Sequence, residues 1–184
     1  MLDLFADTPP WQEPLAPGAI ILRRYARERA PALLQAISEI ACRSPFRQMV
    51  TPGGYTMSVA MTNCGELGWT TNQHGYLYAA DDPLTGKRWP QMPPLFRELA
   101  AEAAAASGYA RFTPDACLIN RYQPGTKLSL HQDKDEQNLR APIVSVSLGL
   151  PAIFQFGGLR RNDPLQRVLL EHGDVVVWGG ESRL

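Results

Sequence analysis

His131 and Asp133 are a histidine and an aspartate two positions apart, and together they could bind one metal ion. An imidazole nitrogen and a carboxylate oxygen are two of the ligands in a 2-His-1-carboxylate triad, which leaves open positions on Fe(II) for a co-substrate and O2. A His-x-Asp tripeptide alone is weak evidence. The same residues could be a surface histidine beside a solvated acidic stretch that runs to Glu136.

Apolar and polar residues alternate before His131, which predicts a half-buried strand over residues 127–131. Residues two apart in a strand share a face. Ser129, His131 and, if the strand continues, Asp133 would therefore project to one side. One metal ion could then contact the imidazole and the carboxylate together.

Length and composition restrict the class of protein. The 184 residues suffice for one domain with a substantial core, and the 45% hydrophobic and 20% charged residues are ordinary for a globular chain. The formal net charge is zero, so a nucleic-acid partner would need local basic patches. The cysteines Cys42, Cys64 and Cys117 form no C-x-x-C pair, which favours a reducing compartment. No signal-peptide pattern or membrane-length apolar run is visible, so a cytoplasmic protein is expected.

Hydrophobic periodicity predicts two helices in a chain made mainly of strands. A proline-rich extended arm at residues 2–18 should precede a strand at 19–24, and helices are expected at 28–42 and 93–107. The part after Gly108 should be all β. Besides residues 127–131, its expected strands are 116–122, 143–150, 153–156, 167–171 and 174–178. Short strands separated by Gly, Pro and Asn/Asp turns predict a sandwich or jelly roll.

Residues 44–91, between the two expected helices, are rich in Gly, Thr, Tyr, Met and Trp. Alternation predicts hairpin strands near residues 55–61 and 76–78. Two interpretations stay open for the aromatic and Met side chains. They could form a small satellite core, or an adaptable surface on which planar ligands stack.

An ordered series of motifs extends through the second half of the chain. It comprises Asn120-Arg121-Tyr122-x-Pro124-Gly125, Leu130-His131-x-Asp133-x-Asp135, residues 142–149 and His172-Gly173-Asp174. The series resembles the AlkB family of Fe(II)- and 2-oxoglutarate-dependent dioxygenases, which remove alkyl groups oxidatively from nucleic-acid bases. The resemblance extends from the N-terminal arm to Arg183.

The resemblance implies a mainly β, α+β fold: a double-stranded β-helix (jelly roll) with an N-terminal nucleotide-recognition lid and with C-terminal strands missing. Residues 1–43 would form an arm, a strand and a helix. Residues 44–91 would form the lid. Residues 92–184 would form a helix and an incomplete jelly-roll catalytic core.

The resemblance also implies roles for single residues. His131 and Asp133 match iron ligands, and the 2-oxoglutarate segment contains Asn120, Arg121 and Tyr122. The positions implied to contact or lie near the substrate are Trp69, Tyr76, Asp135, Arg161, Thr51, Met57 and Met61. Independent chemistry agrees with part of this assignment. Stacking on an aromatic ring is worth about 1–3 kcal/mol per base, and a flipped, cationic methylated base would favour π faces and a carboxylate. Phosphate contacts could come from Lys127, Lys134, Arg160 and Arg161, each of which could instead belong to a solvated face.

The implied substrates are bases such as 1-methyladenine and 3-methylcytosine in single- or double-stranded DNA, or in RNA. The implied reaction consumes O2 and 2-oxoglutarate and releases succinate, CO2 and formaldehyde. A monomer without membrane association is expected. One alternative is a catalytically dead module that binds alkylated or single-stranded nucleic acid through Trp69 and Tyr76. Another is a related oxygenase that acts on a protein or a small molecule.

The sequence departs from the family at its end. The family's second histidine ligand and its two 2-oxoglutarate-binding arginines would fall after Leu184. We therefore expect a truncated chain with weakened binding of iron and co-substrate, in which residues 174–178 lie beside an unpaired sheet edge. Of the histidines that could substitute, His74 favours a substrate or structural role and His172 a hairpin loop. Arg183 favours a structural role.

Overall fold

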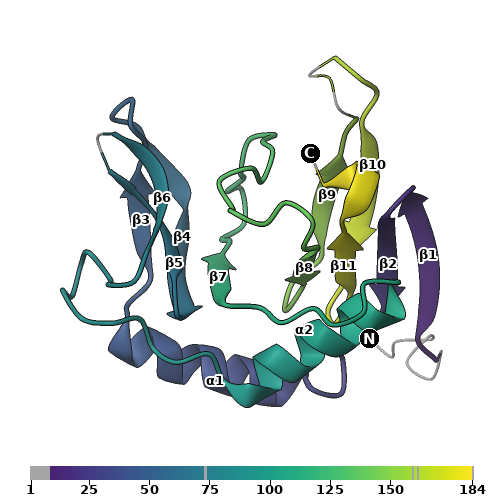
Figure 1. The fold of residues 1–184 in the computed structure, drawn as a ribbon, viewed down its shortest axis with the longest axis horizontal. Coiled ribbons are helices and arrows are strands. Elements are labelled where there is room, and N and C mark those ends of the chain that lie inside the picture. The colour runs from purple at the N-terminus through teal and green to yellow at the C-terminus, as the bar shows by residue number, and fades with distance from the viewer. Residues whose placement is uncertain (1–8, 73, 159, 161, 184) are drawn as a thin grey trace. The chain divides into compact units, whose positions relative to one another are not determined.

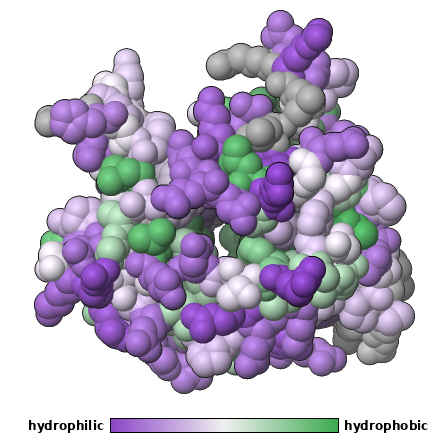
Figure 2. Space-filling view, viewed as in Figure 1, coloured by the Kyte–Doolittle hydropathy of each residue, from purple (hydrophilic) through white to green (hydrophobic). Residues whose placement is uncertain are grey.

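The computed structural model describes residues 9–72, 74–158, 160 and 162–183, and within them the fold is mainly β with two α-helices (Figure 1). The chain forms two compact units. The first contains Met1–Pro31, Ala101–Phe112 and Leu139–Leu184, and the second contains Ala32–Ala100 and Thr113–Asn138. Hydrophilic side chains predominate on the face seen in Figure 2, where hydrophobic residues form small separate patches.

The two helices lie close to their predicted positions, at α1 (Ala30–Arg43) and α2 (Pro94–Ala106). Pro31 occupies the first turn of α1, where its missing N–H breaks no helical hydrogen bond. Gly108 ends α2 in the left-handed conformation, with φ +90°. Its N–H bonds Ala105 O at 3.1 Å and the next N–H, of Tyr109, bonds Ala104 O at 2.8 Å, which is a Schellman cap.

The first unit contains an antiparallel sheet with strand order β1-β2-β11-β8. Its strands are β1 (Trp11–Ala16), β2 (Ala19–Arg23), β11 (Val175–Trp178) and β8 (Ile143–Val146). Strands β9 (Ala152–Phe156) and β10 (Gln166–Leu170) form a separate pair. The core of this unit includes Ile21, Val176 and Leu170, with Phe154 and Phe156 packed against them.

Three expectations for this unit are wrong. Residues 174–178 do not lie beside an unpaired edge, because β11 pairs with β2 on one side and with β8 on the other. Part of the expected extended arm is the strand β1, where Pro14 is tolerated because β1 is at the edge of the sheet. Strand β8 ends at Val146, four residues earlier than predicted.

The second unit contains a three-stranded antiparallel sheet of β3 (Arg47–Val50), β4 (Thr56–Gly65) and β7 (Ala116–Arg121), and a hairpin of β5 (Gly68–Asn72) and β6 (Gly75–Ala79). One sheet face packs on side chains of the helices, with Cys64 and Ile119 against Ile40. The opposite face carries Met49, Val59 and Met61, against which Met57, Trp69, Leu118 and Leu128 pack. We call this set of seven residues the methionine cluster. It underlies the candidate site.

The predicted strand at residues 127–131 is also wrong: these residues have no helix or strand assignment. They lie against β4 through side chains instead. Leu128 packs in the methionine cluster, and the Ser58 hydroxyl donates to Lys127 O at 3.0 Å. Alternation correctly indicated a half-buried segment, with Leu128 less exposed than its neighbours. A strand also needs a partner backbone, and no strand in the described ranges pairs here.

Among the described helices, none has the length and apolar character needed to cross a membrane.

Candidate functional site

His131 and Asp133 converge in the structure. His131 Nε2 lies 3.4 Å from Asp133 Oδ1, and His131 Nδ1 lies 2.7 Å from the backbone carbonyl of Ser129. In a neutral imidazole that donates from Nδ1 to this carbonyl, the lone pair of Nε2 faces the carboxylate side. Metal-binding histidines are oriented in this way, with the second ring nitrogen anchored by a hydrogen bond.

The Asp133 carboxylate raises the pKa of His131 to about 9, because it accepts a hydrogen bond from the charged imidazole, and the Ser129 carbonyl adds to this effect. Burial acts in the opposite direction. The His131 side chain is 58% exposed, so solvent screens the imidazolium–carboxylate pair. A divalent cation placed between the two groups would replace the proton on Nε2.

No third His, Cys, Asp or Glu joins this pair to form a metal-binding group among the residues that the structure describes. The two other histidines have different surroundings. His74 is exposed after β5, and its backbone N–H donates to Asn72 Oδ1 at 2.7 Å. His172 Nδ1 accepts from the Gly149 N–H at 3.0 Å, which agrees with a loop role. Arg183 is 3% exposed and donates to Ala141 O, which agrees with a structural role.

Asn120 lies on the sheet face that carries the methionine cluster, because it is paired with Met61 across β7 and β4. Asn120 Oδ1 is buried and has no hydrogen-bond partner among the described residues. Rotation of the amide exchanges its oxygen and nitrogen, so this side chain can offer N–H groups to a carboxylate.

Tyr122 lies two residues beyond Asn120 and is half exposed. Partial burial raises the pKa of the Tyr122 hydroxyl, which stays protonated and able to donate near neutral pH. Arg121 differs from both. Its guanidinium lies 4.5 Å from the centre of the Phe46 ring, against the helix-facing side of the sheet. The structure therefore brings Asn120 to the candidate site but directs Arg121 elsewhere.

Trp69 on β5 and Tyr76 on β6 form a stacked aromatic pair, with ring centroids 5.2 Å apart and planes 16° apart. Tyr76 is 44% exposed, whereas Met61 is 1% exposed. The methionine cluster is a local core, as the first of the two interpretations expected. The aromatic pair lies beside this core with Tyr76 partly exposed, and its use as a stacking surface for a ligand stays a prediction. Met57 packs partly buried at the same core.

Asp135 joins the aromatic surface, since Trp69 Nε1 donates to Asp135 Oδ2 at 3.4 Å. The remaining predicted residues are more scattered. Thr51 closes a turn through its hydroxyl, which accepts from Tyr55 N–H at 3.1 Å. Lys127, Lys134 and Arg160 are exposed. Arg161 lies outside the described residues.

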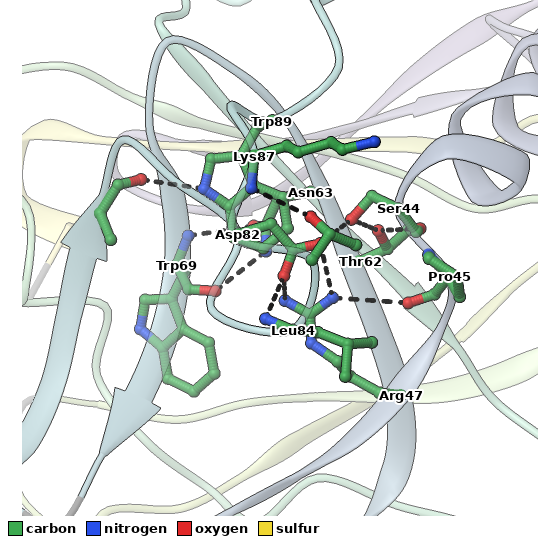
Figure 3. Close-up of polar contacts among 12 residues, drawn as sticks. Ser44, Pro45, Arg47, Thr62, Asn63, Trp69, Asp82, Leu84, Lys87 and Trp89 are labelled. Atoms are coloured by element: carbon green, nitrogen blue, oxygen red, sulfur yellow. Dashed lines mark hydrogen bonds and ion pairs between the residues drawn. The ribbon is translucent and has the colours of Figure 1, made fainter.

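Sequence reasoning missed the groups that hold Trp69 in place. Asn63 is fully buried, and its side-chain amide donates to Trp69 O at 2.9 Å and accepts from Trp69 N–H at 3.0 Å (Figure 3). Nearby, the buried Asp82 is 2.7 Å from Arg47 and accepts a 2.6 Å bond from the Ser44 hydroxyl (Figure 3). Residue type does not distinguish a buried asparagine from a solvated one, so only the fold reveals this support.

The chain is similar to known proteins in both sequence and fold. Residues 18–184 match the model of the 2OG-Fe(II) oxygenase superfamily. The whole chain is 74% identical to the Escherichia coli alpha-ketoglutarate-dependent dioxygenase AlkB and covers 85% of that protein. The human nucleic acid dioxygenase ALKBH1 is 32% identical over 65% of this chain and 30% of its own length.

A solved structure agrees with these sequence matches. The structure of OsALKBH1 superposes with a TM-score of 0.83 at 30% identity, over 95% of this chain and 85% of that chain. The jelly-roll fold class expected from the sequence is confirmed by this match together with the family model. The chain belongs to the AlkB family of the 2OG-Fe(II) oxygenase superfamily.

Proposed function

We propose that the chain is an Fe(II)- and 2-oxoglutarate-dependent dioxygenase that removes alkyl groups oxidatively from nucleic-acid bases. One observation carries the proposal beyond family membership. The ring nitrogen of Trp69, in the aromatic pair, is hydrogen-bonded to Asp135, two residues after Asp133. A stacking surface for a base therefore adjoins a nitrogen–oxygen donor pair of the kind that binds iron.

His131 and Asp133 would hold the iron. Nε2 and the carboxylate suit a borderline divalent cation, and the Ser129 carbonyl would keep the imidazole in the tautomer that binds metal. Bound Fe(II), together with 2-oxoglutarate and O2, supplies the oxidising power for attack on the N-alkyl carbon. The protein contributes ligand geometry and the placement of the alkyl group.

Asn120 and Tyr122 would bind the carboxylates of 2-oxoglutarate. The Asn120 amide has an unsatisfied buried atom, and the Tyr122 hydroxyl stays protonated, so each can donate to an anionic oxygen. A hydrogen bond to a charged group contributes about 1.5–3 kcal/mol. Asn120 and Tyr122 are therefore the main candidates, in the described part of the chain, for binding the 2-oxoglutarate carboxylates.

Trp69 and Tyr76 would stack on the flipped base, and Asp135 would favour a base that carries a positive charge, such as 1-methyladenine or 3-methylcytosine. Met57 and Met61 would support this surface from below, since both belong to the methionine cluster. We assign residues 44–91 as the nucleotide-recognition lid, with Thr51 and Arg161 as further nucleic-acid contacts. The expected partner is alkylated DNA or RNA. We expect the protein itself to be a cytoplasmic monomer.

Substitution of Trp69 by alanine tests the nucleic-acid assignment. Loss of one stacking face should lower kcat/KM for a 1-methyladenine oligonucleotide about tenfold or more, because stacking is worth about 1–3 kcal/mol per base. Trp11→Ala is a matched control, since Trp11 is exposed on β1 in the other compact unit. If Trp69→Ala turns over the methylated oligonucleotide as fast as the unsubstituted chain, the natural substrate is a protein or a small molecule. Binding of the oligonucleotide without formaldehyde release would point to a module that only binds.

A further inference from the structure

Residues 127–136 carry both proposed iron ligands but have no helix or strand of their own. Side chains from other elements hold this ligand segment at both ends. At its start, Leu128 packs in the methionine cluster and the Ser58 hydroxyl bonds Lys127 O. At its end, two consecutive carboxylates bond the β5–β6 hairpin. His131 and Asp133 lie between these anchors.

The anchor at the end of the segment has a specific geometry. The Tyr78 hydroxyl donates to Glu136 Oε1 at 2.8 Å, and Trp69 Nε1 donates to Asp135 Oδ2 at 3.4 Å. Trp69 and Tyr78 are directly opposite each other on β5 and β6, so their side chains leave the same face of the hairpin. Side chains on one face of the hairpin therefore hydrogen-bond two adjacent residues of the ligand segment.

The Tyr78–Glu136 bond is the stronger of the two contacts. It is shorter and partly buried, whereas the Trp69–Asp135 bond is long and exposed. A short O–H···O bond to a carboxylate is among the stronger hydrogen bonds in proteins, and partial burial reduces competition from water. The phenolic hydroxyl of Tyr78 thus makes the shorter and less exposed of these two contacts.

We infer that Tyr78 and Glu136 form a positioning pair for the metal site, and this inference rests on the proposed role of His131 and Asp133 as ligands. The pair fixes the segment three residues after Asp133 on the hairpin that carries the aromatic surface. The metal ligands and the stacking surface are therefore held in one geometry. Neither Tyr78 nor Glu136 touches the reacting atoms in this assignment.

Removal of the hydroxyl should loosen the ligand segment while the hairpin stays folded. In Tyr78→Phe and in Glu136→Leu, the backbone order parameters from NMR relaxation of the metal-free chain should fall from a rigid value of about 0.85 to about 0.6 over residues 131–136 and stay unchanged in β4 and β7. Glu136→Gln keeps a carbonyl oxygen that can accept from Tyr78, so it should retain most of this order. The double variant Tyr78→Phe/Glu136→Leu should add little to either single change.

The affinity for Mn(II), followed by electron paramagnetic resonance, gives a second readout. The dissociation constant should rise on the order of tenfold in Tyr78→Phe, as for the loss of other groups that orient metal ligands. The control is Tyr109→Phe, which removes a tyrosine hydrogen bond of 2.7 Å to Gly18 O in the other unit. It should lower the melting temperature without changing Mn(II) affinity.

The two proposals fail in different ways. Unchanged order parameters over residues 131–136 in both Tyr78→Phe and Glu136→Leu overturn the positioning pair. Equal Mn(II) affinity in Tyr78→Phe and the unsubstituted chain also overturns it. If the order parameters fall as expected but the unsubstituted chain takes up no Mn(II), the segment is positioned as inferred. The metal assignment within the proposed function is then what fails.

Discussion

At the scale of single residues, a proton and a metal ion compete for His131 Nε2. Asp133 raises the pKa of His131 to about 9, above the ordinary 6.5, so the imidazole is protonated at neutral pH in the metal-free chain. The proton must leave when a metal binds. Mn(II) affinity should therefore rise up to about tenfold per pH unit between pH 6.5 and 9 and then level off. Titration across this range measures the slope, and a flat profile would contradict the ligand role of His131.

The same pKa shift makes the stability of the metal-free fold fall with rising pH, whereas the metal affinity rises. A raised pKa means that protonated His131 stabilises the fold. This contribution is complete below about pH 6.5 and is lost as the pH rises through 9. The side chain is 58% exposed, so the effect should be small. The effect is measured by comparing the free energy of unfolding of His131→Gln with that of the unsubstituted chain at pH 6.5 and at pH 9.

Asn63 shows how one buried side chain supports the stacking surface. Its amide satisfies both the backbone N–H and the C=O of Trp69, at 3.0 and 2.9 Å. Asn63→Leu leaves both groups unpaired and should lower the free energy of unfolding by about 2–4 kcal/mol. The tryptophan emission should shift as Trp69 loosens. Gln48→Leu, which removes an exposed bond to Ser58 O from the same sheet, should change stability by less than about 0.5 kcal/mol. Equal losses of stability in Asn63→Leu and Gln48→Leu would contradict a supporting role for Asn63.

At the scale of elements, the β5–β6 hairpin depends on a close approach at Gly68. A Cβ atom there would lie 2.4 Å from the Trp89 ring and 2.8 Å from Asn63 Cβ, so β5 must shift. Gly68→Ala should cost about 1–3 kcal/mol and weaken binding of a methylated oligonucleotide through displacement of Trp69. In Gly53→Ala the new atom meets Tyr55 at an ordinary 3.6 Å, so a neutral result is expected. Chemical denaturation compares the two variants, and a neutral Gly68→Ala would show that the hairpin tolerates the shift.

The elements differ in how far local sequence determines them. The helices were predicted to within about two residues because periodicity, Pro31 and Gly108 are local signals. The strand at residues 127–131 failed because alternation reports burial of Leu128 and not the presence of a partner backbone. Strand β1 was missed because Pro14 is a local signal against a strand, which the position of β1 at the sheet edge overrides.

At the scale of the whole molecule, contacts between distant parts of the chain decide what local reasoning cannot. The family motifs point to His131, Asp133 and Asn120 as candidate site residues. The bonds Tyr78–Glu136 and Asn63–Trp69 carry no sequence signal, because each residue is ordinary until the fold brings its partner close. Strand β11 was expected at an edge, since nothing in its own sequence indicates that β2 pairs with it across more than half the chain.

One such long-range contact stabilises the core of the first unit. Asp174 is 1% exposed and accepts from Arg23 at 2.7 Å and from the backbone N–H of Arg24 and Glu171. Asp174→Asn breaks a buried ion pair and should cost about 3–5 kcal/mol, measured by chemical denaturation. The exposed Arg29–Glu102 pair, also at 2.7 Å, is the control. Glu102→Gln should cost no more than about 1 kcal/mol. Similar losses in the free energy of unfolding for the two variants would show that burial does not determine the contribution of these ion pairs.

We propose that His131 and Asp133 bind the iron of a dioxygenase whose substrate is an alkylated base. The most direct measurement is the yield of formaldehyde and succinate from a 1-methyladenine oligonucleotide with Fe(II), O2 and 2-oxoglutarate. Equal amounts of the two products should form, only with the methylated strand, and Asp133→Ala should abolish both. Succinate without formaldehyde, or products that persist in Asp133→Ala, would contradict this proposal.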